Sequence, residues 1–169
     1  AGEHITPHVI EPSFGVDRTV YTLLAHGYRE DEVDGEPRTS LSLSAEVAPT
    51  AMGVFPLVSN DEELVALAES VAADLRAAGL AVAYDESGNI GRRYRRQDEV
   101  GTPLSVTVDH ESVEREPETV TVRDRDTTAQ VRVPVDDLAD ELSAILAGQT
   151  AVTELLDSYE RVDTDVTRS

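Results

Sequence analysis

The sequence predicts an α/β fold, with a mixed sheet of about five strands flanked by helices and a separate strand–helix unit before it. The order of the expected elements carries this prediction. Between residues 50 and 147 the apolar pattern changes in the order strand, helix, strand, helix, strand, strand, strand, helix. The first half of that order favours parallel strands joined by helical crossovers, and the hairpin that follows adds antiparallel pairs.

The strand–helix unit comes first along the chain. Residues 8–14 have the pattern of a short strand, and the amphipathic stretch from Asp17 predicts a helix that ends at Gly27. Residues 29–38 are acidic and show no periodicity, which is typical of a solvated loop. Apolar residues alternate with polar ones over residues 41–47, as in a half-buried strand.

A domain boundary is expected at residues 47–50, where the apolar rhythm changes. We therefore divide the chain into residues 1–48, residues 49–148, and a C-terminal helix with a polar tail over residues 149–169. The elements expected after the boundary are a buried strand at 51–58, a helix at 59–78 that Ser59 and Glu62 begin with capping-box spacing, a strand at 80–84, a helix at 88–99, a strand at 104–108, a hairpin at 120–133, a helix at 135–146 with Pro134 at its first position, and an amphipathic stretch at 152–159.

The charge of the chain is strongly one-sided. Its 169 residues carry 34 acidic and 14 basic side chains, a net charge of -20, and every basic residue is arginine. Such a chain repels itself in dilute buffer but is screened in concentrated salt, where the Debye length falls to ~3 Å at 1 M. We therefore expect a halophilic protein. Intrinsic disorder is the competing interpretation of this charge, and the clean apolar periodicity argues against it.

Several classes of protein are excluded by composition. The absence of cysteine excludes a disulfide scaffold, thiolate catalysis and Cys-ligated zinc. No apolar run approaches the ~20 residues of a membrane span, and the N-terminus lacks the pattern of a secretory signal. The cytoplasm is the expected compartment. Because the chain begins with Ala1 and its one methionine is Met52, we expect a piece of a longer protein.

An arginine cluster is the most unusual local feature. Four of the fourteen arginines fall within five residues, on a predicted helix whose Gly-rich N-terminus favours anions. Ile90 and Tyr94 share a face of that helix and can be buried. The cluster predicts a contact patch for nucleic acid, and a solvated face paired with carboxylates is the alternative that stays open. Its members are Arg92, Arg93, Arg95 and Arg96.

Two further groups of polar residues lie near the N-terminus. His4 and His8 have helical ligand spacing, but Pro7 lies between them and prevents the helix, so we expect no metal site. Glu11 and Ser13 would point to one side of a strand, and Arg18 at the start of the next helix would face the same end. Together they could bind an ammonium group and a phosphate.

A family resemblance joins these features. The segment HVIEPSFGVDRTVYTLL resembles motif 3 of class II aminoacyl-tRNA synthetases, and its EPSFG form is similar to the archaeal and eukaryotic dimeric glycyl-tRNA synthetases. The resemblance continues, in order, through VAPTAMGVFPL, DESGNIGRRYRRQDEVGTPLSVTVD and TVTVRDRDTTAQVRV. The second half resembles the class IIa anticodon-binding domain, which implies a five-stranded mixed sheet flanked by three helices.

The resemblance implies a role for each matching residue. Glu11 and Ser13 match the pair that contacts glycine, with Glu11 accepting its ammonium group, and Arg18 matches the arginine that holds the ATP phosphates. Asp17 departs from the family, which commonly has glycine there. The anticodon contacts, inferred only from the arginine cluster, are Arg92, Arg93, Tyr94, Arg95 and Arg96.

The resemblance also implies what the chain lacks. Motifs 1 and 2 would lie before Ala1, so the chain is expected to be the C-terminal part of a homodimeric ligase that uses glycine, ATP, Mg and glycine tRNA. The part itself is expected to be inactive and to hold no cofactor. Two rivals stay open: a non-catalytic RNA-binding or accessory protein built on an anticodon-binding domain, and an acidic structural domain with no RNA partner.

Overall fold

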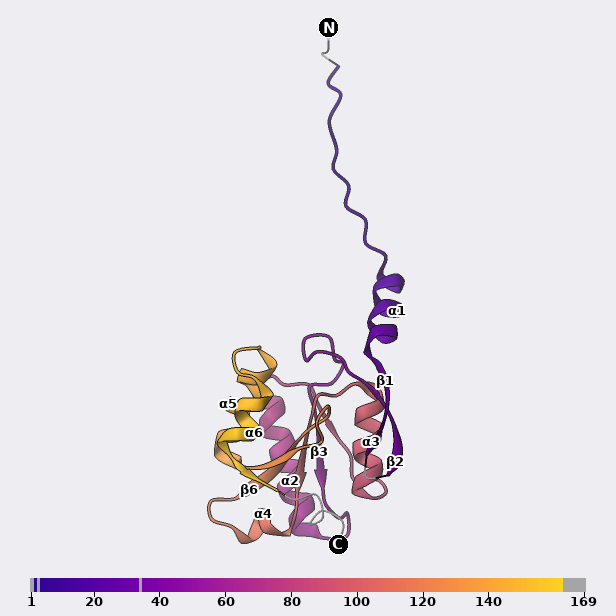
Figure 1. Ribbon diagram of the computed structural model, residues 1–169. Helices are drawn as coiled ribbons and strands as arrows, with labels where there is room; N and C mark the ends of the chain where they lie inside the picture. The colour runs from indigo at the N-terminus through magenta and orange to yellow at the C-terminus, as the bar shows by residue number, and fades with distance from the viewer. Residues whose placement is uncertain (1, 3, 34, 163–169) are drawn as a thin grey trace.

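The computed structural model describes residues 2, 4–33 and 35–162 as a layered α/β body with an N-terminal extension (Figure 1). The main sheet has six strands in the order β4-β3-β5-β6-β7-β8, one more than the sequence indicated. β4 and β5 run parallel to β3, and the remaining pairs are antiparallel. The strands are β3 (Met52–Pro56), β4 (Val82–Tyr84), β5 (Leu104–Val108), β6 (Thr119–Asp124), β7 (Gln130–Pro134) and the added β8 (Glu160–Arg161).

Helices cover both faces of this sheet. The apolar core lies on the face under α2, α5 and α6, where Val54, Val106 and Val122 meet helix residues such as Leu64 and Leu142. α3 packs on the opposite face. The helices of the body are α2 (Glu62–Ala77), α3 (Ile90–Val100), α4 (His110–Glu114), α5 (Val135–Leu146) and α6 (Val152–Ser158).

A glycine lets α3 approach the sheet closely. A Cβ atom at Gly53 on β3 would overlap the ring of Phe55 and would lie 3.1 Å from the side chain of Gln97 on α3. Phe55 in turn meets the ring of Tyr94 on α3 in an edge-to-face contact, with centroids 5.8 Å apart. The second face of the sheet is therefore a packed interface with α3 at β3 and β5.

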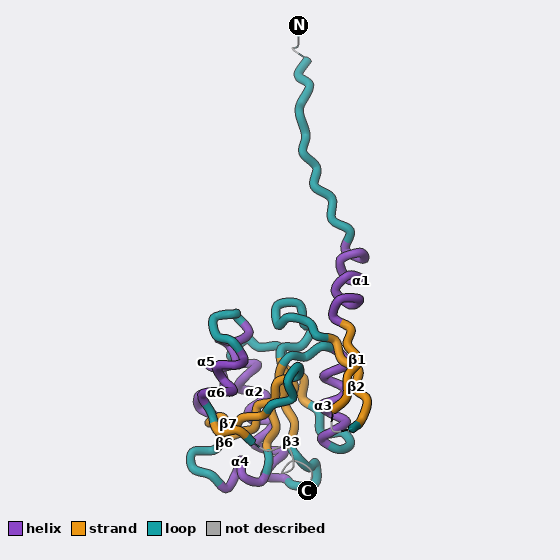
Figure 2. The backbone as a smooth tube through the Cα atoms, viewed as in Figure 1, coloured by secondary structure: helices purple, strands orange, loops and turns teal. Residues whose placement is uncertain are grey.

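The N-terminal region differs from the expectation. Residues 8–14 form no strand: residues 4–15 are extended and exposed, and they lead to α1 (Val16–Gly27), which projects from the body (Figures 1 and 2). A strand needs a partner for its backbone groups, and none of the described residues pairs with this segment. The expected strand is therefore wrong for this chain, while the helix after it is confirmed.

The expected loop at residues 29–38 is also wrong, because it is an antiparallel hairpin of β1 (Tyr28–Val33) and β2 (Glu36–Leu41). Gly35 has φ 80° in the turn, a left-handed conformation that glycine adopts without strain. The strand expected at 41–47 is wrong as well: β2 ends at Leu41, and residues 42–47 form a loop and a turn because no described strand pairs with them. The hairpin packs against α3, and Arg125 fixes the chain after it by donating to the carbonyl of Leu43 at 3.0 Å.

Smaller differences concern the helix ends. Asp61 rather than Ser59 begins α2, because its carboxylate accepts from the backbone of Glu63 at 3.0 Å and of Leu64 at 3.4 Å. Pro134 ends β7 and is the N-cap of α5 instead of its first residue. The short helix α4 was not predicted, and residues 163–169 of the expected polar tail lie outside the described residues.

Candidate functional site

The arginine cluster lies on α3. The helix begins at Asn89, whose side-chain oxygen accepts from the backbone N–H of Arg92 at 3.0 Å, and it ends at Gly101 in the left-handed conformation. Asparagine is a preferred N-cap residue, and glycine is the usual residue in the left-handed conformation that ends a helix. With about 3.6 residues per turn, arginines at four positions in this short helix cannot all face the solvent.

Arg93 is turned inward and is structural. Its side chain is 1% exposed, and its guanidinium donates to the carbonyls of Pro56, of Glu86 at 2.7 Å and of Gly88 at 2.6 Å. It therefore joins the end of β3 to the loop between β4 and α3. Because its donors are used in this way, Arg93 offers little to a ligand in this structure.

Tyr94 is also turned inward. Its hydroxyl lies 2.7 Å from the Thr107 hydroxyl, and the Arg123 guanidinium lies 4.7 Å from its ring centroid. Burial raises the pKa of Tyr94 above its usual value. Arg123 covers one face of the ring, Phe55 meets the ring edge-to-face, and the residue is 9% exposed, so little of the ring is left on which a base could stack.

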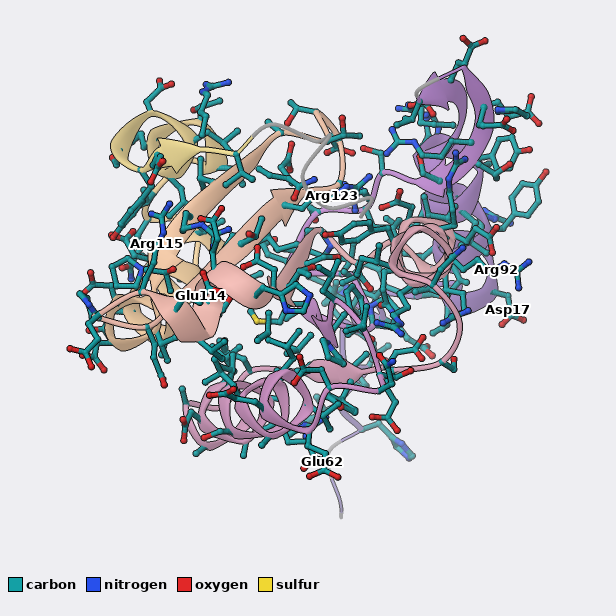
Figure 3. All side chains as sticks on the ribbon, turned by 90° about the horizontal axis from the view of Figure 1, so that it is seen from below. Asp17, Glu62, Arg92, Glu114, Arg115 and Arg123 are labelled. Carbon is teal, nitrogen blue, oxygen red and sulfur yellow. The ribbon has the colours of Figure 1, made fainter. Side chains whose placement is uncertain are left out.

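The other three arginines lie toward the solvent. Arg96 forms an ion pair with Asp85 and donates to the Ser87 carbonyl at 2.7 Å. Burial alone would raise the pKa of Asp85, but hydrogen bonds from Ser87 and Arg96 hold it below its usual value. Arg95 donates to the Pro37 carbonyl at 2.6 Å. Arg92 is exposed and lies at the outer edge of the molecule beyond α3 (Figure 3).

A cleft of about 900 Å³ opens beside α3. Its walls come from the hairpin β1–β2, the loop after β3, the N-terminal turns of α3 and the β6–β7 hairpin. Among the outward-facing arginines, Arg95 lines it directly. A cleft of this size falls in the range of ligand sites, about 300–1,000 Å³.

A buried charge network forms one side of the cleft. Asp98 on α3 accepts from Arg123 on β6 at 3.0 and 3.2 Å and from Arg38 on β2 at 3.3 Å. Arg38 also pairs with Asp31 and donates to the Arg125 carbonyl at 2.7 Å. The hydrogen bond from Arg38 lowers the pKa of Asp31. The network thus fixes the hairpin, α3 and the sheet relative to one another.

Sequence reasoning missed three polar residues of this cleft, although the pattern contained a signal. Along β6 and β7 the valines face the apolar core, so alternate residues must face the other side of the sheet. Arg123 and Gln130 are on that side, opposite each other in the strand register, and Asp98 on α3 accepts hydrogen bonds from Arg123. The alternation could have placed Arg123 and Gln130 on this face of the sheet, but it could not have shown that α3 packs there.

The three N-terminal candidates are not brought together into a site by the described residues. Glu11 and Ser13 lie on the exposed extended segment, and Arg18 lies in the first turns of exposed α1. Apolar side chains around them are also exposed, including Ile10 at 95% and Phe14 at 87%. Among the described residues no group of three His, Asp or Glu side chains could hold a metal. None of the described helices has the length and apolar content needed to cross a membrane.

These features define a mixed-sheet α/β domain of the kind that binds anticodons: residues 52–145 match the family model "Anticodon binding domain", and the chain belongs to this family. Its curated relatives include the glycine–tRNA ligases of Archaeoglobus fulgidus, 48% identical over 158 residues, and Aeropyrum pernix, 49% identical over 142 residues. The matches cover 94% and 84% of this chain but 27% and 23% of those relatives, so the chain spans about a quarter of their length.

A solved structure gives the same fold. Prolyl-tRNA synthetase from Cryptosporidium parvum, in complex with L-proline and AMP, matches with a TM-score of 0.59 and 24% sequence identity. The match covers 70% of this chain and 26% of that one. At this identity the likeness supports the fold alone.

Proposed function

We propose that the chain is the C-terminal part of a glycine–tRNA ligase and that its own role is to bind the anticodon stem-loop of glycine tRNA. One observation carries the proposal: relatives named glycine–tRNA ligase are 44–49% identical to it over 84–94% of its length. The cleft beside α3, with arginines at its border, is a surface on which unpaired bases could be bound.

Binding must depend on short-range contacts. The net charge of -20 repels RNA at a distance, so counterion release by a broad basic surface cannot supply the affinity. Arg92, Arg95 and Arg96 can instead donate charge-assisted hydrogen bonds and offer guanidinium planes for stacking. Arg93 and Tyr94 support this surface from below, since both are buried. Such contacts survive high salt better than long-range attraction does.

The rest of the ligase would complete the N-terminal site. In the whole enzyme Glu11 and Ser13 would contact glycine and Arg18 the ATP phosphates, and Mg would accompany ATP. Glycine and ATP would give glycyl-adenylate, and the 3′ end of the tRNA would then take the glycyl group. A homodimer in the cytoplasm is the expected form of the whole protein. The exposed apolar side chains of α1, such as Tyr21 and Leu24, would pack against the missing catalytic part.

A binding titration tests the role of this chain. A labelled glycine anticodon stem-loop is titrated with the 169-residue protein in about 2–4 M KCl, where charges are screened. Replacing Arg95 and Arg96 together with Ala should weaken binding by roughly 1–3 kcal/mol, the range for a good bidentate contact to a base. A loop with both anticodon cytosines replaced is the RNA control, and Arg76→Ala, which changes an arginine on α2, is the protein control.

Each outcome has a clear meaning. No binding of the parent protein to the stem-loop would contradict the proposed role and favour an acidic structural domain. Full binding by the double variant would show that α3 presents only a solvated face and that the anticodon is bound elsewhere. Binding without preference for the glycine anticodon would favour the alternative of a general RNA-binding accessory protein.

A further inference from the structure

Gln130 has an unused hydrogen-bonding group at the cleft. Its side chain is 4% exposed and lines the cleft, and no described residue donates to its Oε1 atom. Among the described residues, this Oε1 is the one buried side-chain nitrogen or oxygen atom without a hydrogen-bond partner. Buried polar atoms nearly always have a hydrogen-bond partner, so an exception beside an open cleft points to a missing ligand.

The surroundings of Gln130 show why this atom stays unpaired. Gln130 is the first residue of β7 and lies opposite Arg123 in the strand register. Both η nitrogens of Arg123 are directed to Asp98, at 3.0 and 3.2 Å. The guanidinium across the strand pair is therefore engaged with Asp98, and the backbone of Gln130 is held in the sheet. The backbone of Gln130 is thus fixed at the start of β7, and its side-chain acceptor is unused by the described residues.

We propose that Gln130 is a specificity-determining residue that accepts a hydrogen bond from the exocyclic amine of an anticodon base bound in the cleft. This inference rests on the proposed function. Cytosine carries an N4 amine, which is a donor, whereas uracil carries the O4 carbonyl, which is an acceptor. An amide that presents its unpaired oxygen to the base therefore favours cytosine over uracil. The glycine anticodon has cytosine at its second and third positions, so one of these two bases would be the one that pairs with Gln130.

The experiment compares two substitutions at this position. Gln130→Met has a similar length but removes both polar groups, and Gln130→Glu keeps an acceptor at the same place. Each protein is titrated with three labelled stem-loops: the glycine loop and two loops in which one cytosine is replaced by uracil. The salt is about 2–4 M KCl, which screens the added charge of Gln130→Glu. Gln149→Leu, at an exposed glutamine, is the matched control.

The expected result has three parts. Gln130→Met should bind the glycine loop about 10-fold more weakly, a factor within the range for one base contact. It should bind the loop with uracil at the recognised position as the parent does, so the preference for cytosine is lost there. Gln130→Glu should retain that preference. The melting temperature of Gln130→Met should not fall, because the substitution removes a buried acceptor that had no donor.

The contrary results separate this inference from the proposed function. If the parent protein does not bind the glycine loop, the proposed function itself fails. If the parent binds but Gln130→Met keeps both the affinity and the preference for cytosine, the role of Gln130 is overturned and the proposed function stands. A marked fall in the melting temperature of Gln130→Met, with the preference for cytosine unchanged in Gln149→Leu and Gln130→Met, would assign Gln130 a purely structural role.

Discussion

Asp98 on α3 accepts hydrogen bonds from both η nitrogens of Arg123 on β6, at 3.0 and 3.2 Å, and both side chains are almost completely buried. The same carboxylate accepts from Arg38 on the N-terminal hairpin. One acidic residue thus holds three parts of the chain that are far apart in sequence. This arrangement places the charged wall of the cleft on a rigid base instead of on mobile loops.

Asp98→Ala should therefore destabilise the protein strongly. It leaves Arg38 and Arg123 buried without their shared partner, and removing one member of a buried pair costs about 3–5 kcal/mol. Chemical denaturation followed by circular dichroism measures the change. Glu99→Ala, at the exposed neighbour on the same helix, should change the stability by less than about 0.5 kcal/mol. Equal effects of the two substitutions would contradict the network.

Substitution of two adjacent arginines should change the stability by very different amounts. Arg93→Ala leaves the carbonyls of Pro56, Glu86 and Gly88 without their donor and should cost about 3 kcal/mol or more in unfolding free energy. Arg92→Ala removes an exposed side chain and should leave the stability within about 0.5 kcal/mol. Thermal melts of both variants and of the parent, at one KCl concentration, measure the two changes in stability. A melt of Arg93→Ala that matches the parent would place Arg93 on the surface.

The ion pair of Arg132 with Asp109 predicts a dependence of stability on pH. Burial alone would raise the pKa of Asp109, but the hydrogen bond and charge of Arg132, with Thr121 and Ser112, hold it below the usual value. A carboxyl with a lowered folded-state pKa contributes stability above its unfolded pKa of about 3.9, and this contribution is lost as the pH falls through the folded-state value.

The test is a pH series of denaturation curves on the parent and on Asp109→Asn. Asparagine keeps hydrogen-bonding capacity at the start of α4 but does not titrate. The parent should be the more stable protein at pH 7, and the difference in unfolding free energy should shrink as the pH falls from about 5 toward 2. A difference that stays constant across this range would mean that Asp109 does not titrate with the lowered pKa.

The body of the fold could be predicted because burial imposes a period on the sequence. The helix α2 and the strands β3 and β5 carry long apolar patterns that face one core, and the period of each pattern identifies the element that buries it. The hairpin at residues 28–41 could not be predicted in this way. β1 is exposed along most of its length, so its charged residues show no apolar alternation. Its position depends on Arg38 reaching Asp98, a pairing between residues 60 positions apart.

The candidate site was predictable only in part. The sequence located the arginine cluster on a helix, and the structure has that helix. It could not separate buried from exposed arginines, because buried Arg93 donates to backbone carbonyls. Every residue type has such a carbonyl, so the sequence does not show which arginine finds these acceptors. Gln130 was missed for a similar reason. The alternation along β7 could have placed Gln130 on the face opposite the core, but only the three-dimensional structure shows that its Oε1 atom has no partner among the described residues.

Salt should stabilise the protein. The chain carries a net charge of -20 on 18.3 kDa, and screening removes the repulsion among exposed carboxylates faster than it weakens buried pairs such as Arg132 with Asp109. The melting temperature should rise from low KCl to molar KCl. A parallel series in which sorbitol replaces KCl separates screening from general solute effects. A flat or falling profile in KCl would contradict the expectation of a halophilic protein.

The isolated chain should show no glycine-dependent exchange between ATP and pyrophosphate. Glu11, Ser13 and Arg18 lie on an exposed extended segment and an exposed helix, so the described residues do not hold glycine and ATP in a reacting geometry. Positioning supplies a large part of the rate in such reactions, about 7–11 kcal/mol in well-oriented cases. The assay follows labelled pyrophosphate into ATP at molar KCl, with Arg18→Ala as the control for a contaminating ligase. Exchange above background that Arg18→Ala abolishes would show that this chain forms a working site by itself, and the proposal that it needs the rest of a ligase would then fail.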